Sequence, residues 1–395
     1  MLSRALPRAN VLQRLSGDFM RFVQMVFAIV LVSMVSALPV LAGEATPKKW
    51  RILYVEGGPY TNYQQLLAGT ARGLARLGLI ANGNVAIPAE TESSREMWEW
   101  LSKNAGGNRI EFLRDGYYSA NWDSSERERT KEAILKRIQE KKDVDMIWAF
   151  GTWSGLDMAG SVKNIPIFSM SVSDAVGAGI ARSWEDSGQD NLHAQVEPGR
   201  YKRQIAVFHE VFKFKRLGIP YEDTPEGRST CAMDEIEAAA DELGIELVRC
   251  TTPLDLPDPN ESFQNLQQCV KTLSTSSDAI YLTLSSGIQG ERMVELLQPI
   301  IDAGIPSFSQ GGPNEVKLGV LMSLAQASFL DWGQFEADCM AKVINGEKPR
   351  NVNQIFEPAL GLAINLKMAM LIGWNPPLEI LAAVDEIYQQ IQNAQ

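Results

Sequence analysis

Residues 145–179 constrain the fold of this 395-residue chain more than any other stretch. They contain the apolar run Met146–Phe150, a glycine break, helical spacing over 154–162 and a second apolar run over 165–170. An apolar run without alternation indicates a strand buried on both faces, and parallel strands need a crossover such as a helix. The segment therefore predicts a βαβ unit, whose strand ends would offer groups to a ligand.

The same alternation of apolar runs and amphipathic stretches recurs along the chain. Further strands are predicted at 51–55, 109–113, 216–219, 245–250, 279–284 and 305–309. Amphipathic helices are predicted between them, and a C-terminal helix is expected at 378–392. Strands that alternate with helices form parallel sheets with both faces covered. The predicted fold class is α/β, with two doubly wound, Rossmann-like lobes.

The first 42 residues have the features of an export signal. Four arginines precede an apolar stretch at 22–41, and Val40-Leu41-Ala42 fits the small-residue rule for cleavage. This pattern predicts a secretory signal peptide over residues 1–42. An uncleaved membrane anchor is the alternative, because the apolar stretch is nearly long enough to span a bilayer.

Charge and cysteine content narrow the classes of partner and cofactor. The formal net charge of −11 argues against nucleic acid and anionic membranes as partners. An exported chain can oxidise its four cysteines, and a Cys231–Cys250 disulfide is the first expectation, with four buried thiols as the alternative. With two histidines and no C-x-x-C pair, we expect no metal site, and we expect no cofactor.

Several short motifs occur in a characteristic order. Ala149-Phe150-Gly151-Thr152 is followed by Ile165-Pro166-Ile167, by the run from Ser173 to Gly179, by Gly346-Glu347-Lys348-Pro349 and by Asn365 to Ala369. In this order the chain from about residue 48 resembles ABC-transporter solute-binding proteins of the type I periplasmic binding fold. The branch that it resembles includes members that bind tryptophan and other aromatic amino acids. The sequence departs from the family pattern at Ala175, at 191–194 and at Ser285-Ser286.

The resemblance implies two lobes joined by three hinge crossings. Carried over, the first lobe would comprise residues 48–172 and 311–347, and the second 173–310 and 348–395. It also implies a monomeric periplasmic protein that binds a small amino-acid-like solute, aromatic or branched, and delivers it to an ABC permease in the inner membrane.

Strand ends that face the expected cleft supply the candidate ligand-binding residues. They are Glu56, Tyr60, Thr61, Thr152, Trp153, Ser154, Ser173, Asp174, Ser285, Ser286, Gln310 and Gly311. Residues Tyr117, Tyr118 and Trp122 are expected near the rim. The charged run at 126–137 is interpreted as a solvated helix face.

Roles for some of these residues follow from their chemistry, with alternatives left open. Thr152 and Ser154 lie at a helix start, which attracts anions, but either could simply cap the helix. Asp174 could hold a ligand ammonium group or could bond to nearby backbone amides. Tyr60 and Trp153 could stack on a flat ligand.

The sequence leaves two alternative functions, a ligand-sensing module and a secreted hydrolase. The same fold could sense a ligand for a membrane receptor, and the cleft chemistry would be identical. A secreted α/β hydrolase would need a Ser-His-acid triad, for which His193 is the histidine that could reach a cleft edge. Because Ser154 is one position late for G-x-S-x-G, we expect no enzyme.

Overall fold

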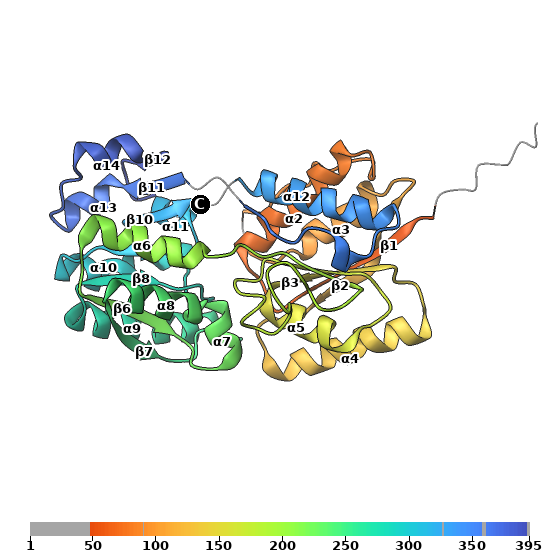
Figure 1. Cartoon of the computed structure of the whole chain (residues 1–395), viewed down its shortest axis with the longest axis horizontal. Helices are drawn as coiled ribbons and strands as arrows, with labels where there is room; N and C mark the ends of the chain where they lie inside the picture. Colours follow the sequence, from red (N-terminus) through yellow and green to blue (C-terminus); the bar gives the residue numbers. More distant parts are fainter. Residues whose placement is uncertain (1–47, 90, 326–327, 358–360, 393–395) are drawn as a thin grey trace, which may run out of the picture. The chain divides into compact units, whose positions relative to one another are not determined.

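Two β-sheets organise the computed structural model, which describes residues 48–89, 91–325, 328–357 and 361–392 (Figure 1). The first sheet consists of parallel strands in the order β2-β1-β3-β4-β5. These strands are β1 (Trp50–Glu56), β2 (Ile110–Ser119), β3 (Met146–Phe150), β4 (Ile167–Met170) and β5 (Leu192–Ala194). We call this sheet with its helices the first lobe.

Helices cover both faces of the first sheet because its strands are apolar on both sides. Successive side chains of a strand point to opposite faces. Within β1, Ile52 and Tyr54 therefore join one apolar cluster, and Leu53 and Val55 join another. The first cluster includes α2 (Thr61–Arg76), α3 (Arg95–Asn104) and α12 (Phe329–Ile344), and the second includes α4 (Ser124–Glu140) and α5 (Gly151–Ser161).

The second sheet has the order β12-β11-β10-β9-β8-β6-β7, with β10 and β11 antiparallel and the other pairs parallel. Its strands are β6 (Arg216–Tyr221), β7 (Glu246–Thr251), β8 (Ala279–Leu282), β9 (Ser307–Ser309), β10 (Met322–Ala325), β11 (Gly361–Asn365) and β12 (Glu386–Tyr388). We call this sheet with its helices the second lobe. The predicted α/β class with two doubly wound sheets is confirmed.

The helices of the second lobe connect its strands and continue the alternation of the chain. They are α6 (Arg200–Phe212), α7 (Pro225–Thr230), α8 (Met233–Leu243), α9 (Pro259–Ser276), α10 (Met293–Ala303), α11 (Pro313–Lys317), α13 (Leu366–Leu371) and α14 (Leu378–Ala383). Two 3₁₀ turns complete the elements, η1 (Gly290–Arg292) and η2 (Pro349–Asn351).

Sheet membership differs from the lobe boundaries expected at 172–173, 310–311 and 347–348. Strand β5 pairs with β4, so the first lobe extends to about Val196, which bridges to Ile355. Strand β10 pairs with β9 and β11, so it belongs to the second lobe, whereas α12 packs on α2 in the first. The change of lobe therefore falls between β5 and α6, between β10 and α12, and between Ile355 and β11. Pairing between distant strands, which local periodicity does not encode, sets these crossings.

The disulfide is a correction to the sequence-based expectation. It joins Cys250 to Cys269, whose Cα atoms are 5.6 Å apart, and not Cys231 to Cys250. Cys269 lies on α9, which packs against β7 and Cys250. The buried thiol of Cys231 instead lies at the end of α7, 3.9 Å from the Leu284 carbonyl oxygen. Because strand side chains alternate between faces, proximity to one sheet edge did not determine the partner.

The C-terminal region also differs from expectation. In place of one helix over 378–392, the chain forms the short α14 and then β12, in which Ile387 pairs in register with Ile364. The free edge of β11 offers backbone hydrogen bonds that a helix at this position would leave unmade.

The expected signal peptide at 1–42 lies outside the described residues. Across 48–89, 91–325, 328–357 and 361–392, no helix combines the length and the apolar character needed to cross a bilayer.

Candidate functional site

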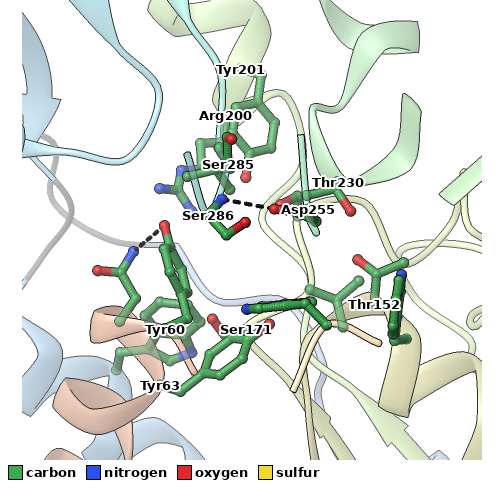
Figure 2. Close-up of a pocket in the computed structure, with 17 residues that line it drawn as sticks. Tyr60, Tyr63, Thr152, Ser171, Arg200, Tyr201, Thr230, Asp255, Ser285 and Ser286 are labelled. Atoms are coloured by element: carbon green, nitrogen blue, oxygen red, sulfur yellow. Dashed lines mark hydrogen bonds between the residues drawn. The ribbon is translucent and has the colours of Figure 1, made fainter. Parts of the chain in front are cut away.

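A cavity opens where the carboxyl ends of strands from both lobes meet (Figure 2). Its walls enclose about 680 Å³ of space not filled by atoms, including the opening to solvent. The lining residues are Tyr60, Asn62, Tyr63, Trp122, Thr152, Trp153, Ser171, Val172, Ser173, Arg200, Tyr201, Thr230, Asp255, Leu284, Ser285, Ser286 and Trp332. Strand ends of this kind are the usual ligand position in open α/β sheets.

Aromatic side chains form much of the first-lobe wall. Tyr60 and Tyr63 meet edge to face with ring centroids 5.2 Å apart, and Trp122 and Trp153 do so at 5.6 Å. A Cβ atom on Gly58 would lie 2.5 Å from the Trp122 ring, so a glycine is needed where this loop passes the indole. The result is an aromatic wall of ring faces and edges, on which a planar ligand can pack.

The start of α5 brings hydrogen-bond donors to the same wall. This helix begins at Gly151, directly after β3, and Thr152 lines the cavity in its first turn. The first amides of a helix lack intrahelical partners and attract anions. Ser154 neither lines the cavity nor caps the helix. Its hydroxyl donates instead to the Phe150 carbonyl oxygen at 2.5 Å.

The second lobe contributes one cation and one anion. Arg200 is the first residue of α6, is 8% exposed, and has its guanidinium 3.5 Å from the Glu197 carboxylate. Asp255 follows β7, and its carboxylate accepts a hydrogen bond from the Ser286 amide at 2.7 Å. Burial raises the pKa of Asp255 to about 6, so this carboxyl is ionised at neutral pH. The cavity therefore presents both charges from one lobe and aromatic rings from the other.

The residues predicted from the sequence divide into two groups. Tyr60, Thr152, Trp153, Ser173, Ser285 and Ser286 line the cavity, and Trp122 joins them from the expected rim. Glu56, Thr61, Ser154, Asp174, Gln310 and Gly311 are not among its lining residues.

Two predicted carboxylates are engaged away from the cavity. Glu56 is fully buried and accepts hydrogen bonds from the Tyr54 and Tyr117 hydroxyls at 2.6 and 2.5 Å. Burial raises the pKa of Glu56 to about 7. Asp174 accepts a hydrogen bond from the Gly177 amide at 2.7 Å, which corresponds to the backbone-bonding alternative.

Two further predicted side chains make structural contacts. Gln310 accepts a hydrogen bond from the Leu284 amide at 2.9 Å and donates to the Cys231 carbonyl oxygen at 2.8 Å. Thr61 donates to the Glu92 carboxylate at 2.9 Å. Gln310 therefore supports the loop after β8, which lines the cavity, without lining it.

Sequence reasoning missed several lining residues, above all Arg200, Asp255 and Trp332. Arg200 follows Pro198-Gly199 at a helix start, and Asp255 lies in a Pro/Asp loop directly after a predicted strand. Attention to every strand end of the second lobe would have identified Asp255. Trp332 reaches the cavity from α12, and no local pattern distinguishes it from a core tryptophan.

His193, the histidine considered for a triad, lies in the core of the first lobe. It is fully buried on β5, with Nε2 3.0 Å from the Asn353 carbonyl oxygen and Nδ1 4.0 Å from the Glu336 carboxylate. Burial lowers the pKa of His193 to about 4, so the ring is neutral at neutral pH. His193 is not among the cavity-lining residues.

Comparisons with known proteins support the resemblance drawn from the sequence. A family model described as ABC transporter substrate binding protein matches residues 111–387. No curated protein matches the chain.

Solved structures give the same indication. An ABC domain in complex with L-Trp from Streptococcus pneumonia is 16% identical, with a TM-score of 0.66. A conserved domain protein from Vibrio cholerae is 19% identical with the same TM-score, and a ligand-free, open substrate binding protein with adhesive properties from Clostridium difficile is 17% identical with a TM-score of 0.56. Each alignment covers 86% of this chain and 100% of the other, and shows a shared fold.

Proposed function

This chain belongs to the ABC transporter substrate-binding protein family, and we propose that it captures an amino acid with an aromatic or branched side chain and delivers it to an ABC permease. It has the type I periplasmic binding fold, and members of its family bind small molecules for such transporters rather than catalyse reactions. The observation that carries the proposal is a cavity lined by Arg200, Asp255 and a group of aromatic rings.

An amino-acid zwitterion suits the polar part of this cavity. The ionised Asp255 would hold the ammonium group, which is one of the two roles expected for Asp174 from the sequence. The ligand carboxylate would lie toward Arg200 and the amides at the start of α5, next to Thr152. A charged ligand group left without such a partner inside a cavity would be costly to desolvate.

An aromatic side chain suits the first-lobe wall. Tyr60, Trp122 and Trp153 offer ring faces and edges on which a flat group can stack. Offset or edge-to-face contacts contribute about 0.5–1.5 kcal/mol each beyond the burial of apolar area. The L-Trp complex with the similar fold supports this choice of ligand class.

The setting of the protein is part of the proposal. Residues 1–42 would direct export to the periplasm as a cleaved signal peptide, and the mature chain would act as a monomer. Of the described residues, the first lobe would comprise 48–196 with 328–356, and the second 200–325 with 361–392. Ligand contact with both lobes would then favour the closed arrangement.

Isothermal titration and thermal shift with L-tryptophan, L-phenylalanine and L-leucine test the proposal. At a hundredfold excess over Kd, a ligand should stabilise the protein by about 2.7 kcal/mol. Tryptamine, which lacks the carboxylate, and indole-3-propionate, which lacks the ammonium group, are matched controls that should bind much more weakly. If the folded protein responds to none of the twenty amino acids, the proposal is wrong.

A further inference from the structure

Arg127 contacts Trp153, a residue of the cavity wall, but does not itself line the cavity. This residue lies in the first turns of α4, and its guanidinium carbon is 5.0 Å from the centre of the Trp153 ring. A cation over a tryptophan face is attracted by the ring quadrupole. Trp153 lines the cavity, whereas Arg127 is not among the lining residues. Arg127 therefore acts on a ligand indirectly, and its contact with the indole is one route for that action.

The guanidinium of Arg127 is held in this position by a second residue of α5. Its Nε and Nη2 atoms each donate to a carboxylate oxygen of Asp157 at 2.9 Å. Asp157 is four residues after Trp153, so both side chains lie on the same face of the helix. A two-point contact of this kind fixes the plane of the guanidinium, which a lysine cannot do.

A smaller hollow shares Trp153 with the ligand cavity as a lining residue. It encloses about 230 Å³ and is lined by Gly57, Arg127, Trp153 and Met158, among others. Trp153 therefore borders two spaces. Arg127 also lines that hollow, and its cation–π contact stabilises the observed position of the ring.

The same guanidinium also reaches the second lobe. Its Nη1 atom is 3.6 Å from Oε1 of Glu226, in the first turn of α7. Thr230, at the other end of this short helix, lines the cavity. Helix α7 thus contacts both Arg127 and the ligand space, and the ion pair forms only when α7 lies against the first lobe.

We propose that Arg127 is a positioning residue that couples the orientation of Trp153 to closure of the two lobes through its ion pair with Glu226. This inference rests on the proposed function. A ligand that packs on Trp153 keeps the indole under Arg127, and Arg127 in turn favours the position of α7 that closes the cavity. Removal of either partner should therefore speed ligand release more than it slows ligand capture.

The variants separate the three contacts of Arg127, which are with Trp153, Asp157 and Glu226. Glu226→Gln removes only the contact between lobes, and Arg127→Lys keeps the charge but loses the two-point contact with Asp157. Arg127→Gln removes all of them. Matched controls are Arg129→Gln, an exposed position on the same helix, and Glu210→Gln, an exposed position of the second lobe.

Stopped-flow binding of L-tryptophan gives the first readout. Glu226→Gln should raise the dissociation rate by about twofold to fivefold, the effect of one partly exposed ion pair. Arg127→Gln should raise it by about fivefold to thirtyfold, because the cation–π contact is lost as well. The double variant should be no worse than Arg127→Gln alone, and the association rates should stay near wild type. Equal dissociation rates in Arg127→Gln and Arg129→Gln would overturn the proposal.

A readout without ligand separates this inference from the choice of ligand. Spin labels at Lys136→Cys on α4 and Asp241→Cys on α8, both exposed, report the distance between lobes. Glu226→Gln and Arg127→Gln should shift the distance distribution toward the open form, and the two controls should not. Unchanged distributions would overturn the coupling, even if L-tryptophan binds. A shift together with no amino-acid binding would support the coupling and refute the proposed ligand.

Discussion

Gly333→Ala tests the closest contact between α2 and α12, the two helices that bring Tyr63 and Trp332 to the cavity. An added Cβ at Gly333 would lie 2.1 Å from the carbonyl carbon of Gly69 and 2.3 Å from the amide nitrogen of Thr70. Both atoms belong to the backbone of α2, so no side-chain rotation can relieve the overlap. Carbon atoms in favourable contact are about 3.5–4.0 Å apart.

The cost of this substitution can be worked out from that geometry. To reach contact distance, α12 must move away from α2 by about 1.5 Å, which loosens apolar packing along the pair. Overpacking of a core usually costs about 1–3 kcal/mol and occasionally more. Alanine returns at most about 1 kcal/mol of helix propensity. We expect a net loss of about 2 kcal/mol in the free energy of unfolding, together with weaker ligand binding because Trp332 adjoins Gly333.

Urea unfolding followed by tryptophan fluorescence measures the loss. Gly160→Ala is the matched control, since Gly160 lies in α5 of the same lobe and a Cβ there meets nothing within 4 Å. The control should be unchanged or slightly more stable. If Gly333→Ala is as stable as Gly160→Ala, the close approach of the two helix backbones does not limit residue size, and the reasoning is refuted.

Three further predictions concern Asp255, the disulfide and Glu336. Because burial raises the pKa of Asp255 to about 6, its protonation should weaken amino-acid binding by about tenfold between pH 7 and pH 5. In titration calorimetry, Asp255→Asn should bind weakly at both pH values. Reduction of the Cys250–Cys269 bond should lower the free energy of unfolding by about 3 kcal/mol. Urea unfolding with and without reductant measures this loss, and an unchanged midpoint would contradict the prediction. Burial raises the pKa of Glu336 to about 8, so the native state loses stability as the pH rises from the unfolded pKa near 4.5 through 8. In urea unfolding, the free energy of unfolding of Glu336→Gln should therefore rise by about 3 kcal/mol relative to wild type between pH 5 and pH 7.5. A difference that stays constant with pH would refute this assignment.

Local periodicity predicted the elements that are buried on both faces. The run Met146–Phe150 and the strand near 51–55 are apolar without alternation, and each became a central strand of the first sheet. The same reasoning failed at 378–392, where the chain forms α14 and then β12. The pairing of Ile387 with Ile364 is a contact between distant residues, and helical spacing in the sequence cannot report it.

The residues of the candidate site also differ in whether local sequence or distant contacts place them. Thr152 and Trp153 were predictable because a strand, a glycine and a helix start follow one another in the sequence, and strand ends lie at a common edge. Trp332 was not predictable, because α12 returns to the first lobe after the chain has built most of the second. The charged run at 126–137 was interpreted as a solvated face, yet Arg127 contacts Trp153 in the folded chain.

The order of residues along this chain was enough to predict its α/β class, its two doubly wound sheets and the turn at Gly151, because each depends on neighbours within a few residues. The partner of Cys250, the points where the chain crosses between lobes, and the meeting of Arg200 and Asp255 with the aromatic wall depend on which distant segments pack together. Those contacts arise from the summed burial of many side chains, and no single stretch of sequence contains that sum.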